Sequence, residues 1–321
     1  MNSGGSVDRL YPIAALSQRE VADLRMDALC VDDVDIDTLL RDWRAKSGAL
    51  RSRVRPALAA KDSDILPLNV SPSVSARIEK LVSAYRAYLP AIYEVGMVPL
   101  SKLVSPQRHV DLDYARVSFD GIDRTLTDDE VANYCIGTPV RDAKIDASFL
   151  GYPSGRPGEF SYLYQFSSED QNVRYIPPMP LKPFQDLDIA NDRGTERYDV
   201  KAITVLVGPG MPFIHVLKVA VGVDGPGGRP IYRFVISNGV HRLFRLAELG
   251  NTHAAALIQP VEMRDIPDPF IDVKRESLFG ADALRITEMA NSQFGRVFKW
   301  KKSKRVIKLQ VNVMQEVSFV P

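Results

Sequence analysis

The sequence has few cysteines, no long uninterrupted apolar run and no excess of one charge. Its two cysteines, Cys30 and Cys135, lie far apart among 321 residues, which argues against a disulfide scaffold and a cysteine-rich zinc site. We expect both to be free thiols in a reducing compartment. No window reaches the roughly eighteen consecutive apolar residues of a membrane-spanning helix, and residues 1–16 lack the pattern of a signal peptide. The sequence therefore predicts a cytoplasmic protein without a membrane partner.

The overall charge gives no sign of a general nucleic-acid binder. Lysine and arginine exceed the acidic residues by a net charge of only +1. Hydrophobic residues make up 45% and charged residues 25% of the chain, as in ordinary soluble globular proteins. The length suits one large domain or two ordinary ones. Any affinity for polyanions must therefore come from uneven placement of charge.

The first part of the chain, residues 1–95, is predicted to be mainly helical. We expect residues 1–16 to form a loose leader and residues 17–60 and 73–95 to form helices, from their apolar spacing. Two explanations fit the arginines of residues 17–60: a basic surface, or a solvated helix face balanced by nearby aspartates. The sequence favours the solvated face. The arginines are Arg41, Arg44, Arg51, Arg53 and Arg55, and the aspartates are Asp35, Asp37 and Asp42.

A polar loop and a long irregular segment follow. The run Gln107-Arg108-His109 leads into Asp111 and Asp113; these residues could form part of a site or make local loop hydrogen bonds, and we favour the loop. Residues 119–200 are rich in Gly, Pro, Asp and Tyr. Irregular segments of this length are uncommon in compact domains and are often functional. We expect an insertion that acts as a lid or a surface for protein partners, a role that the N-terminal helices could share.

The most informative stretch is 231–259. It predicts a strand that stops at Ser237-Asn238-Gly239, a helix from Val240 to Glu248, a stop at Gly250 and a second strand. His241 and Arg242 thus lie at the start of a helix that directly follows a strand and its turn. Backbone N–H groups are free at such a position, and phosphate binds there readily. The alternative for His241 is a helix-start residue hydrogen-bonded to a neighbouring carbonyl.

This stretch resembles the ParB/sulfiredoxin superfamily. The resemblance covers the opening Val98-Pro99-Leu100-Ser101-Lys102-Leu103 with Pro106 and 111–114, the strands at 213–221 and 232–236, and the turn, helix and strand at 237–258. It implies that the turn holds nucleotide phosphates, of ATP or another NTP with Mg²⁺. The implied phosphate-binding residues are Ser237, Asn238, Gly239, His241 and Arg242, of which His241 and Arg242 would also be catalytic.

Two departures from the family pattern exclude some family activities. Val240 stands where sulfiredoxins have a cysteine before His-Arg, so thiol chemistry is excluded. The Val-His-Arg run replaces the Glu-Arg-Arg of chromosome-partitioning members, and no DNA-reading helix-turn-helix is identifiable after Gln259. The resemblance therefore implies nucleotide binding without choosing the reaction.

Metal ligands are harder to place than phosphate ligands. His109, His215 and His253 lack ligand spacing with one another. Asp111, Asp113 and Glu248 are the acidic residues that could approach a nucleotide-bound metal.

The C-terminal segment carries the most uneven charge. Seven Lys and Arg residues occur between Arg296 and Lys308, with Phe298 and Trp300 among them. We expect this segment to form a hairpin. Basic and aromatic residues on a hairpin suit phosphate contact and base stacking; a basic turn on a solvated hairpin is an equal alternative. The predicted nucleic-acid-binding residues are Lys299, Trp300, Lys301, Lys302, Lys304 and Arg305.

Together these observations predict an α+β protein in three parts. They are a helical region at 1–95, a ParB/sulfiredoxin-like domain at 96–262 with an insertion at about 119–200, and an extension at 263–321 with a basic hairpin. The favoured function is nucleotide binding coupled to NTP hydrolysis or phosphoryl transfer, in a DNA or RNA context such as DNA modification, defence, or plasmid and phage maintenance. A non-enzymatic adaptor subunit that binds nucleic acid is the alternative, and a nuclease is third.

Overall fold

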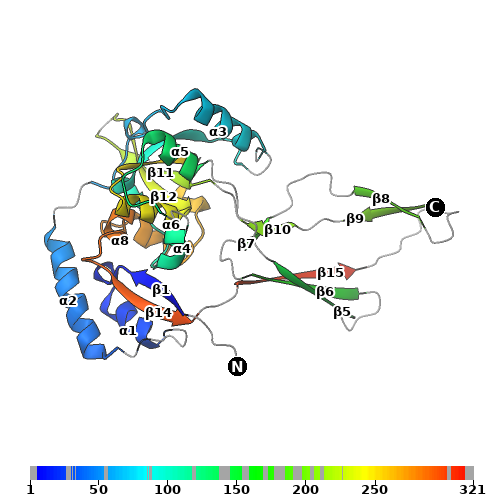
Figure 1. The fold of residues 1–321 in the computed structure, drawn as a ribbon, viewed down its shortest axis with the longest axis horizontal. Helices are drawn as coiled ribbons and strands as arrows, with labels where there is room; N and C mark the ends of the chain where they lie inside the picture. Colours follow the sequence, from blue (N-terminus) through cyan, green and yellow to red (C-terminus); the bar gives the residue numbers. More distant parts are fainter. Residues whose placement is uncertain are drawn as a thin grey trace. The chain divides into compact units, whose positions relative to one another are not determined.

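The fold combines helices and strands in an α+β arrangement, as the sequence predicts (Figure 1). The computed structural model describes residues 6–26, 30, 32, 34–53, 57–84, 86, 89–117, 121–136, 145–153, 159–168, 173–176, 185–190, 197–202, 206–209, 213–225, 227–301 and 305–314. Within these residues, no helix has the length and apolar character needed to cross a membrane.

The chain divides into two compact units. Unit 1 comprises Met1–Thr138 and Pro212–Lys302, and unit 2 comprises Pro139–Met211 and Ser303–Pro321. This division differs from the predicted one. The inserted unit starts after helix α5 (Asp128–Cys135), not near residue 119, and the predicted C-terminal extension is shared between the two units.

The centre of unit 1 is a mixed sheet of five strands. Its strand order is β2-β13-β11-β12-β3, in which β11 is parallel to β13, β12 is parallel to β3, and the other pairs are antiparallel. The strands are β2 (Glu94–Pro99), β3 (Leu103–Val104), β11 (His215–Val223), β12 (Pro230–Asn238) and β13 (His253–Val261). Residues 254–258 of β13 are all buried, which is typical of a strand covered on both faces.

A second, smaller sheet begins near the N-terminus. Strand β1 (Ser6–Tyr11) lies between β14 (Arg296–Lys301) and β4 (Val110–Asp111). The prediction of a loose leader at 1–16 is therefore wrong for residues 6–16. Tyr11, Phe298 and Trp300 are buried in a core that also contains Ile13 and Leu39. Hydrophobic burial of these side chains fixes the first strand in place.

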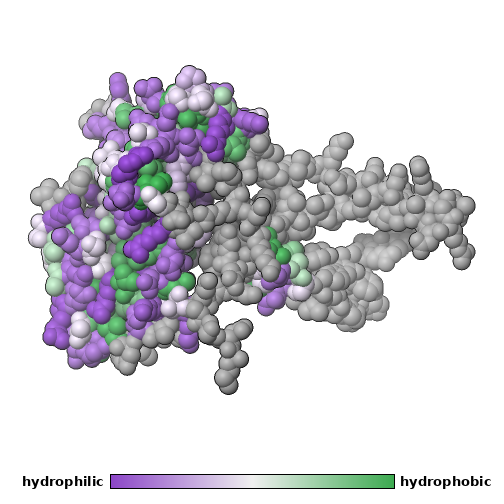
Figure 2. Space-filling view, viewed as in Figure 1, coloured by the Kyte–Doolittle hydropathy of each residue, from purple (hydrophilic) through white to green (hydrophobic). Residues whose placement is uncertain are grey.

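Helices α1 and α2 pack beside this small sheet (Figure 1). The helices of unit 1 are α1 (Gln18–Met26), α2 (Ile36–Ser52), α3 (Pro72–Ala84), α4 (Leu112–Val117), α5, α6 (Val240–Glu248), α7 (Arg275–Phe279) and α8 (Ile286–Met289). Short 3₁₀ turns are η1 (Ile13–Ala15), η2 (Asp62–Asp64), η4 (Leu100–Lys102) and η5 (Met263–Asp265). The part of unit 1 that contains α2 presents mostly hydrophilic residues (Figure 2). Helix α3 ends at Ala84 and not at the predicted residue 95.

Unit 2 is built from strands in the described residues. A three-stranded antiparallel sheet has the order β15-β6-β5, and two further pairs join β7 with β10 and β8 with β9. The strands are β5 (Asp146–Pro153), β6 (Glu159–Ser168), β7 (Val173–Ile176), β8 (Gln185–Ala190), β9 (Arg197–Ala202), β10 (Leu206–Pro209) and β15 (Arg305–Met314). The predicted irregular insertion is thus largely extended strand where it is described.

The predicted basic hairpin is wrong. Strand β14 pairs with β1 in unit 1, whereas β15 pairs with β6 in unit 2. The reason is that each strand finds its partner far away in the sequence, although only residues 302–304 separate the two strands. Their proximity in sequence suggested a local pairing that the fold does not use.

Candidate functional site

The candidate site lies at the turn from β12 into α6. Gly239 has φ 101°, a left-handed conformation that side chains with a Cβ adopt at a cost. A Cβ built on Gly239 would lie 2.8 Å from Cγ1 of Ile214. Glycine is therefore required both by the backbone and by the close approach of Ile214, which sets the position of the helix start.

The first turn of α6 carries no negative charge. Gly239 provides no side-chain cap, and the turn contains no acidic residue. The N-terminal N–H groups of a helix carry partial positive charge that anions and carboxylates normally offset. This helix start therefore keeps a positive potential that its own side chains do not offset.

Asn238 and Ser237 complete the turn. The Asn238 Nδ2 donates to the carbonyl of Phe213 at 2.7 Å, so this side chain helps to shape the turn. Ser237 is partly exposed at the end of β12. Both residues lie beside the helix start, as predicted.

The structure brings His241 and Asp111 together. The backbone N–H of Asp111 donates to Nε2 of His241 at 3.2 Å, and the Tyr114 ring lies edge-on to the His241 ring at 5.0 Å between centroids. Burial lowers the pKa of His241 to about 4, although the Asp111 carboxylate opposes this shift. His241 is therefore neutral near pH 7, and its Nε2 accepts a hydrogen bond from a backbone N–H that is distant in the sequence.

Arg9, which the sequence does not single out, lies beside Asp111 and so belongs to the same cluster as His241 and Tyr114. Its Nε lies 2.6 Å from Oδ1 of Asp111, with both side chains about 15% exposed or less, and its guanidinium lies over the Trp300 ring at 5.1 Å. His109 stacks on Tyr11 at 5.3 Å, and burial together with Arg9 lowers its pKa. No local pattern distinguishes Arg9, because its role depends on strand pairing between β1 and β4.

Arg242 contacts the protein itself. Its Nη1 donates to the carbonyls of Tyr134 and Cys135 at 3.3 and 3.1 Å, at the end of α5. Helix ends leave carbonyls without partners inside the helix, and this guanidinium caps them. Burial lowers the pKa of Arg242 and raises that of the Cys135 thiol to about 12, so Cys135 is not a reactive thiolate.

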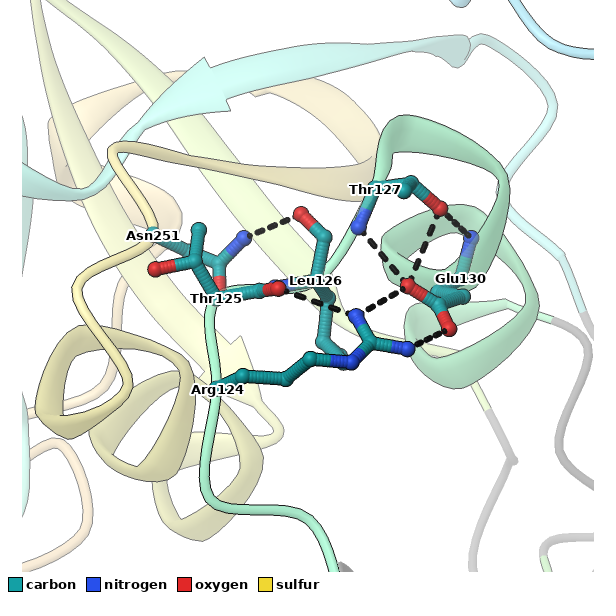
Figure 3. Close-up of polar contacts among 6 residues, drawn as sticks. All are labelled: Arg124, Thr125, Leu126, Thr127, Glu130 and Asn251. Atoms are coloured by element: carbon teal, nitrogen blue, oxygen red, sulfur yellow. Dashed lines mark hydrogen bonds and ion pairs between the residues drawn. The ribbon is translucent and has the colours of Figure 1, made fainter.

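The segment before α5 is fastened to the far end of α6 (Figure 3). Asn251 accepts from the Leu126 N–H at 3.2 Å and donates to the Leu126 carbonyl at 2.9 Å, and Thr125 donates to the carbonyl of Leu249 at 2.8 Å. Thr127 is the N-cap of α5: its hydroxyl accepts from the Glu130 N–H, and the Glu130 carboxylate accepts from the Thr127 N–H. The Arg124 guanidinium lowers the pKa of Glu130 to about 2, helped by hydrogen bonds from Thr127. The Thr-x-x-Glu spacing is a signal in the sequence from which this cap could be predicted.

Other predicted site residues lie elsewhere in unit 1. Glu248 is at the opposite end of α6, where it pairs with Arg245 at 3.0 Å, and Asp113 is exposed on α4. Asp111 is thus the only one of the three predicted acidic residues beside His241. Within the described ranges, no group of three His, Cys, Asp or Glu residues could hold a metal ion.

The predicted nucleic-acid-binding residues differ in their exposure to solvent. Lys299 and Lys301 are exposed on β14, but Trp300 is 3% exposed and packs in the core, so its prediction as a base-stacking residue is wrong. Strand alternation places Trp300 on the opposite face from both lysines. Lys302 and Lys304 lie outside the described residues, and Arg305 begins β15.

Comparisons with known proteins add no relative. The chain matches no protein-family model, and searches of curated proteins and of solved structures return no significant match.

Proposed function

We propose that the turn from Ser237 to Arg242 binds the phosphates of a nucleotide, ATP or another NTP. The observation that supports this proposal is the start of α6, which follows a left-handed glycine and has neither a side-chain cap nor an acidic residue in its first turn. Such a helix start offers N–H donors and positive potential to an anion. The resemblance of 237–258 to the ParB/sulfiredoxin superfamily favours a nucleotide as that anion.

In this proposal the side chains around the turn have separate roles. Ser237 and the first N–H groups of α6 contact phosphate, while Asn238 and Gly239 set the shape of the turn. We assign Arg242 to positioning α5 against α6, because its guanidinium donates to two carbonyls of α5. Asp111 is the acidic group that would approach nucleotide-bound Mg²⁺ through water.

Hydrolysis or phosphoryl transfer would follow binding. His241 is a weak candidate for a general base, because its pKa is about 4 and a base works best when its pKa is near the operating pH. Catalysis would then rest on positioning and neutralisation of phosphate charge by the helix start and the metal. The same observation on His241 favours, as a second candidate, an adaptor that binds the ligand without turning it over.

Thermal unfolding of the full chain with a panel of NTPs and Mg²⁺ tests the proposal. A ligand that binds only the folded state raises the melting temperature, by an amount that grows with its concentration. Ser237→Asp should remove the shift, because it places a carboxylate where phosphate would bind, yet a carboxylate near a helix start does not harm the helix. Ser73→Asp in the first turn of α3 is the matched control and should keep the shift.

The outcomes separate the candidates. A shift that Ser237→Asp removes, followed by release of inorganic phosphate, supports the nucleotide-dependent enzyme. The same shift without phosphate release supports the adaptor. No shift with any NTP contradicts nucleotide binding at this turn.

A further inference from the structure

The outer face of α2 carries a row of exposed arginines. The inner face of this helix buries Leu39, Ser47 and Leu50. On the outer face Arg41, Arg44, Gly48 and Arg51 are exposed, and Arg53 follows the helix end. With 3.6 residues per turn, positions 41, 44, 48 and 51 fall within an arc of about 80°. We call these five residues the arginine ridge.

Two of the three acidic residues that could neutralise the ridge contact other groups. Asp35 caps α2, where its carboxylate accepts from the Thr38 N–H at 2.9 Å. Asp42 lies 3.8 Å from Lys46 and 3.3 Å from Arg296. Of the three aspartates expected to balance the arginines, only the exposed Asp37 remains. The ridge therefore has a local excess of positive charge.

The arginines themselves have few partners in the described part of the chain. Arg41 donates to Oγ1 of Thr38 at 3.1 Å, and the Arg53 guanidinium lies over the Phe294 ring at 5.8 Å. Among the residues that the structure describes, none of the four arginines is within 4.0 Å of a carboxylate. Their guanidinium groups are thus available to an external anion.

Gly48 is a second, independent feature of this face. Glycine inside a helix lowers helix stability relative to alanine, so a structural reason is expected for it. A Cβ at Gly48 would meet nothing within 4 Å, which means that packing against the described residues does not require glycine. A partner that approaches the helix backbone closely between Arg44 and Arg51 would supply the reason.

We propose that the arginine ridge binds the phosphate backbone of a nucleic acid. Arginine donates in a fork that matches phosphate geometry. From Arg41 to Arg51 the ridge extends roughly 15 Å along the helix axis, enough for several successive phosphates of a strand. This proposal is independent of the nucleotide-binding turn, which lies on α6.

The composition of the face favours a nucleic acid over an anionic membrane. Helices that lie in a bilayer surface insert large apolar side chains beneath their basic residues. On α2 the apolar residues Leu39 and Leu50 are buried in the protein core, and the residues between the outer arginines include Ala45, Gly48 and Ala49. The hydrophilic surface around α2 agrees with this distribution (Figure 2).

The test measures binding of the full chain to short fluorescent DNA and RNA over a range of salt concentrations. Each phosphate contact contributes about 0.9 to the slope of log K against log salt for duplex DNA, so Arg44→Gln/Arg51→Gln should lower that slope by about 1.8. Binding should weaken alike for different base sequences, because phosphate contacts carry no sequence information. Lys80→Gln/Lys274→Gln removes two exposed charges elsewhere and should leave the slope nearly unchanged.

Two further variants sharpen the test. Gly48→Ala should raise the melting temperature of the free protein and weaken nucleic-acid binding, a combination that a merely structural glycine would not give. Ser237→Asp should retain nucleic-acid binding, which separates this proposal from nucleotide binding. The proposal is overturned if the wild-type chain binds neither DNA nor RNA, if the ridge and control variants behave alike, or if the ridge selects anionic vesicles or an acidic peptide instead.

Discussion

The backbone N–H of Asp111 donates to Nε2 of His241 across 130 residues of sequence, at 3.2 Å. This single hydrogen bond joins the start of α4 to the start of α6. It requires that Nε2 carry no proton, so the contact depends on the protonation state of the ring.

Acid should therefore weaken the fold through His241. The unfolded ring takes up a proton near pH 6.5, whereas burial lowers the pKa of the folded ring to about 4. Between these values the unfolded chain binds more protons, so stability present above pH 6.5 is lost as the pH falls towards 4. The loss from this group is on the order of 3 kcal/mol.

Urea unfolding at a series of pH values measures this loss. His241→Gln keeps an acceptor and removes the titration, so its stability should fall less over the same range. An equal fall in wild type and variant would show that another group is responsible.

Gly239→Ala should destabilise the protein by about 2 to 4 kcal/mol, from backbone strain and an overpacked contact. The Cβ would lie 2.8 Å from Ile214 Cγ1 at φ 101°. Gly225→Ala is the control, since φ there is 79° but nothing lies within 4 Å. It should cost about 1 to 2 kcal/mol in chemical denaturation. Equal costs would remove the role assigned to Ile214.

Arg242→Met should cost about 2 to 3 kcal/mol, because it leaves the carbonyls of Tyr134 and Cys135 without a charged donor. Hydrogen exchange of the amides of α5 should become faster, while α2 should be unaffected. Arg242→Lys retains one charged donor and should recover part of the loss. Unchanged exchange in α5 would contradict the positioning role.

Arg233→Met should be neutral or stabilising by about 1 kcal/mol or more. Arg233 is 9% exposed, and its Nε and Nη1 have no hydrogen-bond partner within the described residues. Its Nη2 donates to the Phe279 carbonyl at 3.1 Å. Burial and the neighbouring Arg285 lower its pKa, so the charge is unfavourable where it lies.

Arg285→Met is the comparison for Arg233. Arg285 Nε lies 3.7 Å from Glu288, and both side chains are buried. Its loss should cost roughly 3 to 5 kcal/mol because the carboxylate would remain buried without that partner. Equilibrium unfolding that gives both variants the same cost would refute the distinction.

The sequence predicted the strands and helix around the candidate turn closely. The helix spans Val240–Glu248 as expected, and Gly250 takes φ 83° after it. These features have local causes: apolar spacing, a turn signal and a left-handed glycine stop. The same reasoning placed Ser237, Asn238 and His241 at the helix start.

The errors concern residues whose partners are distant in sequence. Residues 6–11 form a strand only because β14 and β4 lie beside them, and no local pattern announces such pairing. The prediction that Trp300 stacks on bases is wrong because it follows the charge of the neighbouring residues. The alternation of Phe298 and Trp300 with Lys299 and Lys301 along a strand indicates instead that Trp300 faces the core. Arg9 and Arg242 gain their roles from contacts with Asp111 and α5, which sequence spacing does not reveal.

The division of β14 and β15 between two units has a consequence for synthesis on the ribosome. Strands β1 and β6 emerge long before the segments that pair with them. At about 5 to 20 residues per second, β1 waits roughly 15 to 60 seconds for β14. An unpaired strand edge invites pairing with other chains. The nascent chain therefore has an unpaired edge on β1 for most of its translation, whereas a full-length chain refolding from denaturant has both partners at once.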